Sequence, residues 1–319
     1  MLKLRADPWM PDYGMGFQAA LEEPPHRADP FVETSDWSRP VSPSGPGPAA
    51  VWFVDGVRRV DVRLIAEAPD GSRRVPGLFG SYAVGAVRCD GSAEFASHAV
   101  ARAVVTVGGL VPERVEVPCG AHRLGFESAT DPKDDPDRPL LRLQDLMRER
   151  EAALAAEVAG AGTELVLVDG PLSLRDETKA PVVGMVKRFA RRYLEAEQER
   201  LLSILEAGER TPVFGLELPG QAVERYAWYL RLVPLRPPWH DHAGIVRCEV
   251  PAGIGVDRAV RLADLVTTVL PRFAGRPTDP RAPQNLAPVG GLETWLRHRM
   301  GHPGIVRRAV LEWLSKEAA

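Results

Sequence analysis

The chain has 319 residues, of which 45% are hydrophobic and 26% charged, and its formal net charge is -3. This length allows a substantial core, and no stretch approaches the ~18 uninterrupted apolar residues that span a bilayer, so composition excludes a membrane-inserted protein. The opening residues hold a carboxylate and a proline where a secretory signal has an apolar core, and the three cysteines are scattered. We therefore expect a cytoplasmic protein without a disulfide framework.

Two segments of different composition divide the chain. Residues 1–48 are rich in proline and glycine and end in Ser42-Pro43-Ser44-Gly45-Pro46-Gly47-Pro48. Neither a continuous helix nor a central strand tolerates such a run. We interpret residues 1–48 as an arm that leads into one domain over residues 49–319.

Three strand patterns open this domain. An apolar run over 50–54 closes at Asp55-Gly56, as a buried strand followed by a turn does. A two-residue alternation follows over 60–67, and 81–89 is a third candidate. Three strands with short links predict an antiparallel meander.

The remaining elements alternate between helices and strands. In chain order we expect a helix over 140–158, a strand over 164–170, a long helix over 181–207, strands over 212–218, 226–232 and 244–250, and helices over 256–270 and 292–300. The order strand-strand-strand-helix-strand-helix-strand is that of the ribonuclease H-like fold. The sequence thus predicts an α/β protein whose mixed sheet is flanked by helices, with an N-terminal arm and C-terminal helical additions.

Two aspartates occupy the same sequence context. Asp55 and Asp169 each follow four apolar residues and precede a glycine. An aspartate that ends a buried strand is held rigidly while its oxygens meet solvent, which suits a catalytic metal. The same pattern suits a turn-forming Asp-Gly pair. If the two strands are neighbours, both carboxylates lie at one sheet edge and can share a cation.

A third carboxylate is expected from helical geometry. At ~100° per residue, the apolar residues of the helix over 140–158 form one stripe, and Glu151 lies on or beside it. Glu149 points nearly the opposite way. A glutamate on an apolar stripe needs a partner, and a metal held by two aspartates is one. A narrower apolar face would instead leave Glu151 at its rim.

Two aspartates and one glutamate form a hard-oxygen site suited to Mg²⁺ or Mn²⁺. Such sites favour phosphoryl transfer, in which bound ions position the scissile phosphate, activate water and stabilise the leaving oxygen. The sequence has no Gly-rich Walker loop, which argues against hydrolysis of nucleoside triphosphates.

Five spaced motifs follow one another over most of the chain, after an opening pair. They are Val54-Asp55-Gly56, Leu146-Met147-Arg148-Glu149-Arg150-Glu151, Val166-Leu167-Val168-Asp169-Gly170-Pro171-Leu172, Val183-Gly184-Met185-Val186-Lys187 and Pro283-Gln284-Asn285-Leu286, after Asp7-Pro8-Trp9 with Asp12-Tyr13-Gly14. In these motifs the sequence resembles the bacterial form of the NurA nucleases.

The resemblance implies a ribonuclease H-like nuclease domain, a homodimer, and Mn²⁺- or Mg²⁺-dependent DNA degradation with 5′ to 3′ exonuclease and single-strand endonuclease activity. It also implies partnership with the hexameric HerA ATPase in DNA end resection and double-strand break repair. By matching motif, Asp55, Glu151 and Asp169 take the family's catalytic and metal-ligand roles.

The C-terminal motif departs from the archaeal pattern of this family. Archaeal members carry tyrosine and histidine in a Pro-rich segment near the final helices, and residues 283–291 here contain neither. Asn285, which is the single asparagine of the chain, or Gln284 then supplies a neutral oxygen ligand or holds a substrate phosphate.

Basic runs indicate where DNA lies against the protein. One run begins at Lys187 and a second comprises Arg297-His298-Arg299 with Arg307-Arg308. Both suit phosphate binding, and both suit a solvated helix face equally well. We expect Lys187 to neutralise a phosphate near the metal, with Arg188 and Arg191 guiding the strand.

Two other functions stay open at the level of sequence. Because the C-terminal motif is altered, the chain also fits a catalytically weak DNA-binding or regulatory partner of a ring ATPase. It also fits a ribonuclease H-like enzyme that acts on RNA. No membrane partner is expected for any of these.

Overall fold

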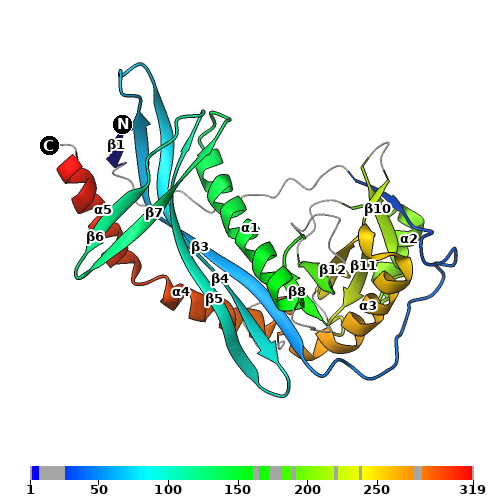
Figure 1. Cartoon of the computed structure of the whole chain (residues 1–319). Coiled ribbons are helices and arrows are strands. Elements are labelled where there is room, and N and C mark those ends of the chain that lie inside the picture. Colours follow the sequence, from blue (N-terminus) through cyan, green and yellow to red (C-terminus); the bar gives the residue numbers. More distant parts are fainter. Residues whose placement is uncertain are drawn as a thin grey trace.

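The structure is a computed structural model, which describes residues 2–6, 26–160, 165–172, 181–187, 192–218, 222–236, 239–275 and 282–317. Twelve strands of these residues form one sheet in the order β2-β10-β11-β12-β9-β8-β3-β4-β5-β7-β6, with β1 pairing β3 outside this path (Figure 1). The strands are β1 Lys3–Ala6, β2 Arg27–Asp29, β3 Val51–Glu67, β4 Arg74–Cys89, β5 Ala93–Val107, β6 Val115–Cys119, β7 His122–Asp131, β8 Val166–Asp169, β9 Val182–Val186, β10 Phe214–Glu217, β11 Val223–Arg231 and β12 Ile245–Pro251. The α-helices are α1 Arg138–Gly160, α2 Ala196–Ile204, α3 Val256–Val269, α4 Ala287–Arg299 and α5 Pro303–Glu317, with short 3-10 helices at Ala252–Ile254 and Leu270–Phe273.

The centre of the molecule is a ribbon of three long antiparallel strands, β3, β4 and β5 (Figure 1). These strands have 15 to 17 residues each, so the ribbon is ~50 Å long. It joins a lobe built from β6, β7 and α5 to a lobe built from β10, β11, β12, α2 and α3. Next to β3 lies β8, which is parallel to it, and β9 is parallel to β8. The expected mixed sheet is therefore confirmed, whereas the antiparallel meander is built from β3, β4 and β5 and not from the three strands predicted over 50–54, 60–67 and 81–89.

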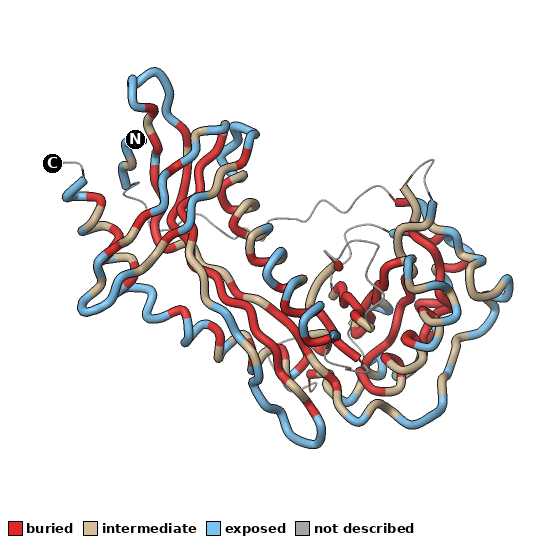
Figure 2. The backbone as a smooth tube through the Cα atoms, viewed as in Figure 1, coloured by how far each residue is buried: buried red, intermediate tan, exposed pale blue. Residues whose placement is uncertain are grey.

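Helices cover both faces of the ribbon. One core cluster joins α1 to Val54 of β3, and a second cluster joins α4 and α3 to Phe53 of the same strand. Because successive residues of a strand point to opposite faces, β3 has an α1 face and an α4 face. Figure 2 shows the buried residues concentrated along the ribbon and in the lobe of β10–β12.

β3 corrects the expected start of the domain. This strand runs from Val51 to Glu67 without a break, so the prediction that a strand ends at Asp55-Gly56 is wrong. Asp55 pairs with Gly85 of β4, and the ladder continues along the whole strand. The two strands expected over 50–54 and 60–67 are one strand. The Asp55-Gly56 pair lies in the interior of that strand, where α1 approaches the backbone closely.

The long helix expected over 181–207 is also wrong. β9 occupies Val182–Val186, and a separate helix, α2, begins at Ala196. The valines at the start of the segment favour a strand, and the parallel ladder with β8 satisfies their main-chain groups. Apolar residues with helical spacing thus come from a strand and a helix that are distinct elements.

Residues 26–48, the second half of the expected arm, lie along the lobe of β10–β12. β2 pairs with β10, and Val41 bridges to Arg210. The buried guanidinium of Arg210 forms ion pairs with Glu33 at 2.8 Å and with Asp264 at 2.6 Å. The segment is thereby fastened to the domain, and the boundary at residue 48 stays a prediction. In the described part of the chain, no helix is long and apolar enough to cross a membrane.

Candidate metal centre

Asp55 lies inside β3 and points to its α4 face. The residue is 6% exposed, and Phe53 and Val57, two positions away on either side, belong to the core cluster of α4. The parallel ladder sets Val54 beside Val168 of β8. Asp55 and Asp169 are the next residues after this pair, so they lie side by side on the same face of the two neighbouring strands.

Asp169 ends β8, where the chain turns at Gly170 with a φ of +119°, a conformation that favours glycine. Lys187 directly follows β9, and because β9 is parallel to β8, both residues lie at one edge of the sheet. The Nζ atom of Lys187 donates a hydrogen bond to Oδ2 of Asp169 at 2.5 Å. Each of these side chains is 16% exposed, so the pair is largely sheltered from solvent.

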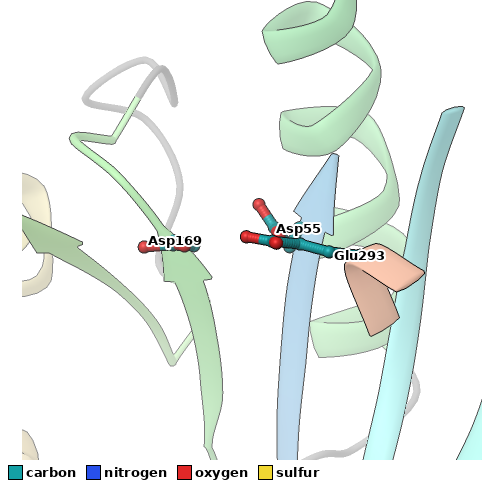
Figure 3. Close-up of side chains that lie close together, drawn as sticks. All are labelled: Asp55, Asp169 and Glu293. Carbon is teal, nitrogen blue, oxygen red and sulfur yellow. The ribbon is translucent and has the colours of Figure 1, made fainter. Parts of the chain in front are cut away.

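A third carboxylate comes from α4. Asp55, Asp169 and Glu293 each offer an oxygen, and these oxygens lie within 4.8 Å of one another (Figure 3). Glu293 also forms an ion pair with Arg297, one turn further along α4, at 3.2 Å. Oxygens that bind one Mg²⁺ at ~2.1 Å lie ~3 to ~4 Å apart. The three carboxylates thus have the spacing of a site for a divalent cation after small adjustments.

Glu151 approaches the same strand from the other face. It belongs to α1 and is 6% exposed, and a Cβ placed on Gly56 would overlap its Oε1 atom and lie 2.9 Å from Cγ of Met147. The absence of a side chain at Gly56 therefore makes room for the close approach of α1 to β3. Burial raises the pKa of Glu151 to about 8, the charge of Asp169 acts in the same direction, and Arg148 and the N–H of Gly56 oppose it. Glu151 lies outside the set of three oxygens but within electrostatic reach of it.

Burial is the main cause that raises the pKa of Asp55 well above its ordinary value. The negative charges of Asp169 and Glu151 raise this pKa further, while Lys187 lowers it. The Oδ2 atom of Asp55 is buried and has no hydrogen-bond partner among the described residues. Crowded carboxylates of this kind stay ionised only when a cation offsets their repulsion.

The residues present fit a divalent metal ion. All the clustered donors are carboxylate oxygens, which Mg²⁺ and Mn²⁺ prefer. Asp55, a member of the cluster, has a buried Oδ2 atom with no hydrogen-bond partner among the described residues. The described part of the chain places no histidine or cysteine in this cluster. Asp55, Asp169 and Glu293 would hold the ion, with Glu151 on the opposite side of β3.

The other predicted site residues divide into two groups. Asn285 lies in the turn before α4, where its main-chain N–H donates to the carbonyl of Ala282 at 2.9 Å, and its role as a ligand stays a prediction. Arg188 and Arg191 fall outside the described residues. Lys187 was expected at the start of a helix and instead directly follows β9; its contact with phosphate also stays a prediction.

Glu293 was missed at the level of sequence, although a signal for it exists. Leu292 and Leu296 mark the buried stripe of α4, and Glu293 lies beside that stripe, as Glu151 does on α1. The predicted ligand of the C-terminal segment, Asn285, lies eight residues before Glu293.

A comparison with protein families bears on the identity of the chain. Residues 68–289 match the model of the NurA domain, which is more than half of the sequence. The chain belongs to the NurA family. The predicted resemblance is thus confirmed, and membership of this family of nucleases identifies the chain as a nuclease.

The NurA match includes Glu151 and Asp169 but neither Asp55 nor Glu293, which flank it on either side. No curated protein matches the chain. Among solved structures, the chain is similar to the crystal structure of Ciona intestinalis endonuclease V in complex with a 24mer DNA containing an inosine followed by a ribo-adenosine. That likeness has a TM-score of 0.32 and 10% identity, over 79% of this chain and 86% of the other, and at this level it carries no argument.

Proposed function

We propose that this NurA protein is a DNA nuclease that hydrolyses phosphodiesters with a divalent metal held by Asp55, Asp169 and Glu293. The observation that carries the proposal is the convergence of these carboxylates, from three separate elements, to within 4.8 Å. Placing three carboxylates together is costly unless a cation joins them, and hard-oxygen sites of this kind serve phosphoryl transfer.

Each residue of the centre has a distinct task. The three clustered carboxylates would hold the ion, which would act there as a Lewis acid on the phosphate and activate water. Glu151 adds negative charge from the α1 face. Lys187, already bonded to Asp169, supplies a positive charge for a phosphate that enters the site. Burial of Asp55 limits the water around the reacting phosphate.

The family resemblance supports the finer parts of the proposal. These are dependence on Mn²⁺ or Mg²⁺, 5′ to 3′ exonuclease and single-strand endonuclease activity on single strands and duplex ends, and a homodimer. We also infer partnership with a HerA-type hexameric ATPase in end resection and double-strand break repair. Three free cysteines fit the reducing cytoplasm as the place of action.

Incubation of the purified protein with end-labelled DNA tests the activity. Single-stranded and duplex substrates, labelled at either end, are supplied with Mn²⁺, Mg²⁺ or EDTA, beside an Asp55→Asn variant as the inactive control. We expect metal-dependent cleavage of DNA, with 5′-labelled mononucleotides released early from exonuclease action. No cleavage by the wild type, alone or with its ATPase, would overturn the nuclease. Preferential cleavage of matched RNA would instead favour a ribonuclease.

Co-sedimentation tests the partner. A HerA-type ATPase is mixed with the protein and with a variant in which Arg307 and Arg308 are replaced by alanine as a charge control. We expect one complex and an increase in the rate of duplex degradation that requires ATP. Separate sedimentation of the two proteins, together with an unchanged rate, would contradict the partnership.

A further inference from the structure

An aromatic ledge lies at the surface beside α4. We define it as Phe95 and His98 of β5 with Trp295 and Arg299 of α4. The rings of Phe95 and Trp295 stack with centroids 4.9 Å apart and an interplanar angle of 14°. His98 meets the edge of Trp295 at 4.7 Å, and the guanidinium of Arg299 lies 4.8 Å from the centre of that ring.

Phe95 is an exposed ring of the ledge, with 39% of its surface accessible. Trp295 covers one face of the Phe95 ring, and the other face is turned away from Trp295. Gly291 of α4 lies beside this ring, since a Cβ there would be 3.8 Å from Cζ of Phe95, an ordinary contact distance. A ligand that covers this ring would bury its exposed apolar surface, which is favourable.

The ledge is in register with the metal centre. Asp55 pairs with Gly85 of β4, and Gly85 pairs with His98 of β5, so His98 lies two strands, or ~10 Å, from Asp55. Above these strands, Leu292 and Leu296 form the buried stripe of α4. At ~100° per residue, Glu293 lies on one side of that stripe and Trp295 on the other. α4 therefore carries a metal ligand on one flank and the ledge on its opposite flank.

The charge around the ledge favours a polyanion. The last turn of α4 contains Arg297, His298 and Arg299, all of them exposed. Stacked aromatic rings next to arginines are the combination with which proteins bind single-stranded nucleic acid, since every base has a flat face and every linkage has a negative charge.

We propose that the aromatic ledge binds single-stranded DNA by stacking an unpaired base on the outer face of Phe95. The proposal rests on the proposed function for its substrate class. The strand would cross the outer side of α4, past Gly290 and Thr294, where the helix has small side chains. A path around half of a helix ~10 to ~12 Å wide is ~16 to ~19 Å long, and this length would separate the stacked base from the scissile phosphate.

Binding of a fluorescein-labelled oligothymidine, measured by anisotropy in EDTA, tests the ledge without cleavage. Phe95→Ala is compared with Phe95→Trp, which keeps a stacking ring, and with Phe31→Ala, which removes an equally simple ring that is 58% exposed elsewhere. We expect Phe95→Ala to weaken binding by about 5-fold to about 100-fold, and the other two variants to bind like the wild type. Equal affinity of Phe95→Ala and the wild type would overturn the proposal.

Oligothymidines with one abasic position at successive sites identify the stacked base. We expect one position at which the missing base weakens wild-type binding but leaves binding by Phe95→Ala unchanged, because the same contact is removed twice. An equal loss in both proteins at every position would contradict stacking on Phe95. Sedimentation of the same variants tests whether a second copy of the chain covers the ledge instead. If Phe95→Ala dissociates a dimer and leaves DNA affinity unchanged, the ledge is an interface between two copies and the proposal is wrong.

The two proposals fail in different ways. If the wild type binds the oligothymidine through Phe95 but cleaves no DNA with any metal, the DNA-binding proposal for the ledge stands and the nuclease proposal is wrong. If the wild type cleaves DNA and Phe95→Ala binds and cleaves at the wild-type level, the nuclease stands and the ledge fails.

Discussion

The two faces of β3 each have a carboxylate close to the strand, but the carboxylates are placed there in different ways. On the α4 face the strand itself carries a carboxylate, Asp55, and Glu293 joins it to within 4.8 Å. On the α1 face the strand carries Gly56, and the absence of a side chain lets Glu151 approach the backbone. Asp55 and Gly56, which are adjacent in sequence, therefore determine where carboxylates lie on the two faces of the strand. The carboxylate on the strand, Asp55, is completed by carboxylates from neighbouring elements. The carboxylate on the helix, Glu151, reaches the strand because Gly56 has no side chain.

The largest expected effect is the loss of one of the two aspartates in the three-carboxylate cluster. Asp55→Asn and Asp169→Asn should each reduce cleavage at least ~100-fold, because changes beside metal ligands already cost 10-fold to 100-fold. Initial rates on labelled single-stranded DNA with Mn²⁺ measure this. Asp70→Asn, in an exposed turn between β3 and β4, is the matched control. Wild-type rates in both variants would place the metal elsewhere.

Substitution of Glu293 and of Glu151 tests which face of β3 contributes more to metal binding and cleavage. We expect Glu293→Gln to reduce cleavage by about 100-fold and to weaken the apparent affinity for Mn²⁺, and Glu151→Gln to reduce cleavage by about 10-fold, because Glu151 lies outside the three-oxygen set. Titration of activity with Mn²⁺ measures both quantities. Glu149→Gln, on the exposed side of α1, should behave like the wild type. The reverse order would make the α1 face the principal metal site.

The pH dependence of stability sharpens the difference further. The folded-state pKa of Glu151 is raised from 4.5 to about 8, so the folded protein binds more protons than the unfolded chain between these values. The contribution of Glu151 to stability is therefore full below pH 4.5 and is lost as pH rises toward about 8, by on the order of a few kcal/mol. Urea unfolding in EDTA should show this decline for the wild type relative to Glu151→Gln. A constant difference between the two proteins across this range would contradict it.

The smallest expected effect concerns the space at Gly56. Gly56→Ala should destabilise the fold by about 1 to 2 kcal/mol, because the new Cβ overlaps the end of Glu151 and crowds Met147, both of which have flexible side chains. Thermal unfolding measures the loss. Gly47→Ala, where φ is not positive and a Cβ would make only ordinary contacts at 3.7 Å or more, is a control for the general cost of replacing glycine. We expect pairing of this substitution with Glu151→Ala to recover part of the stability, and no recovery would mean that Glu151 is not the obstacle.

The sequence by itself determined the parts that local patterns encode. Apolar runs indicated β8 and β12, the stripe of α1 indicated that Glu151 is buried, and the repeated context of Asp55 and Asp169 indicated that they are equivalent. These features depend on residues that are close together in the chain. Burial of a stripe and the apolar character of a strand are local properties, so they could be predicted.

Only the tertiary structure decided which carboxylates meet. Glu293 is 238 positions after Asp55, and the packing of α4 on β3 brings them together, whereas no local pattern encodes that distance. The Asp-Gly pair at residue 55 resembles a turn by composition, but pairing with β4 on one side and β8 on the other holds it in a strand. The same pair at residue 169 does end its strand. Hydrogen bonding to neighbouring strands, which are set by the whole fold, makes this difference.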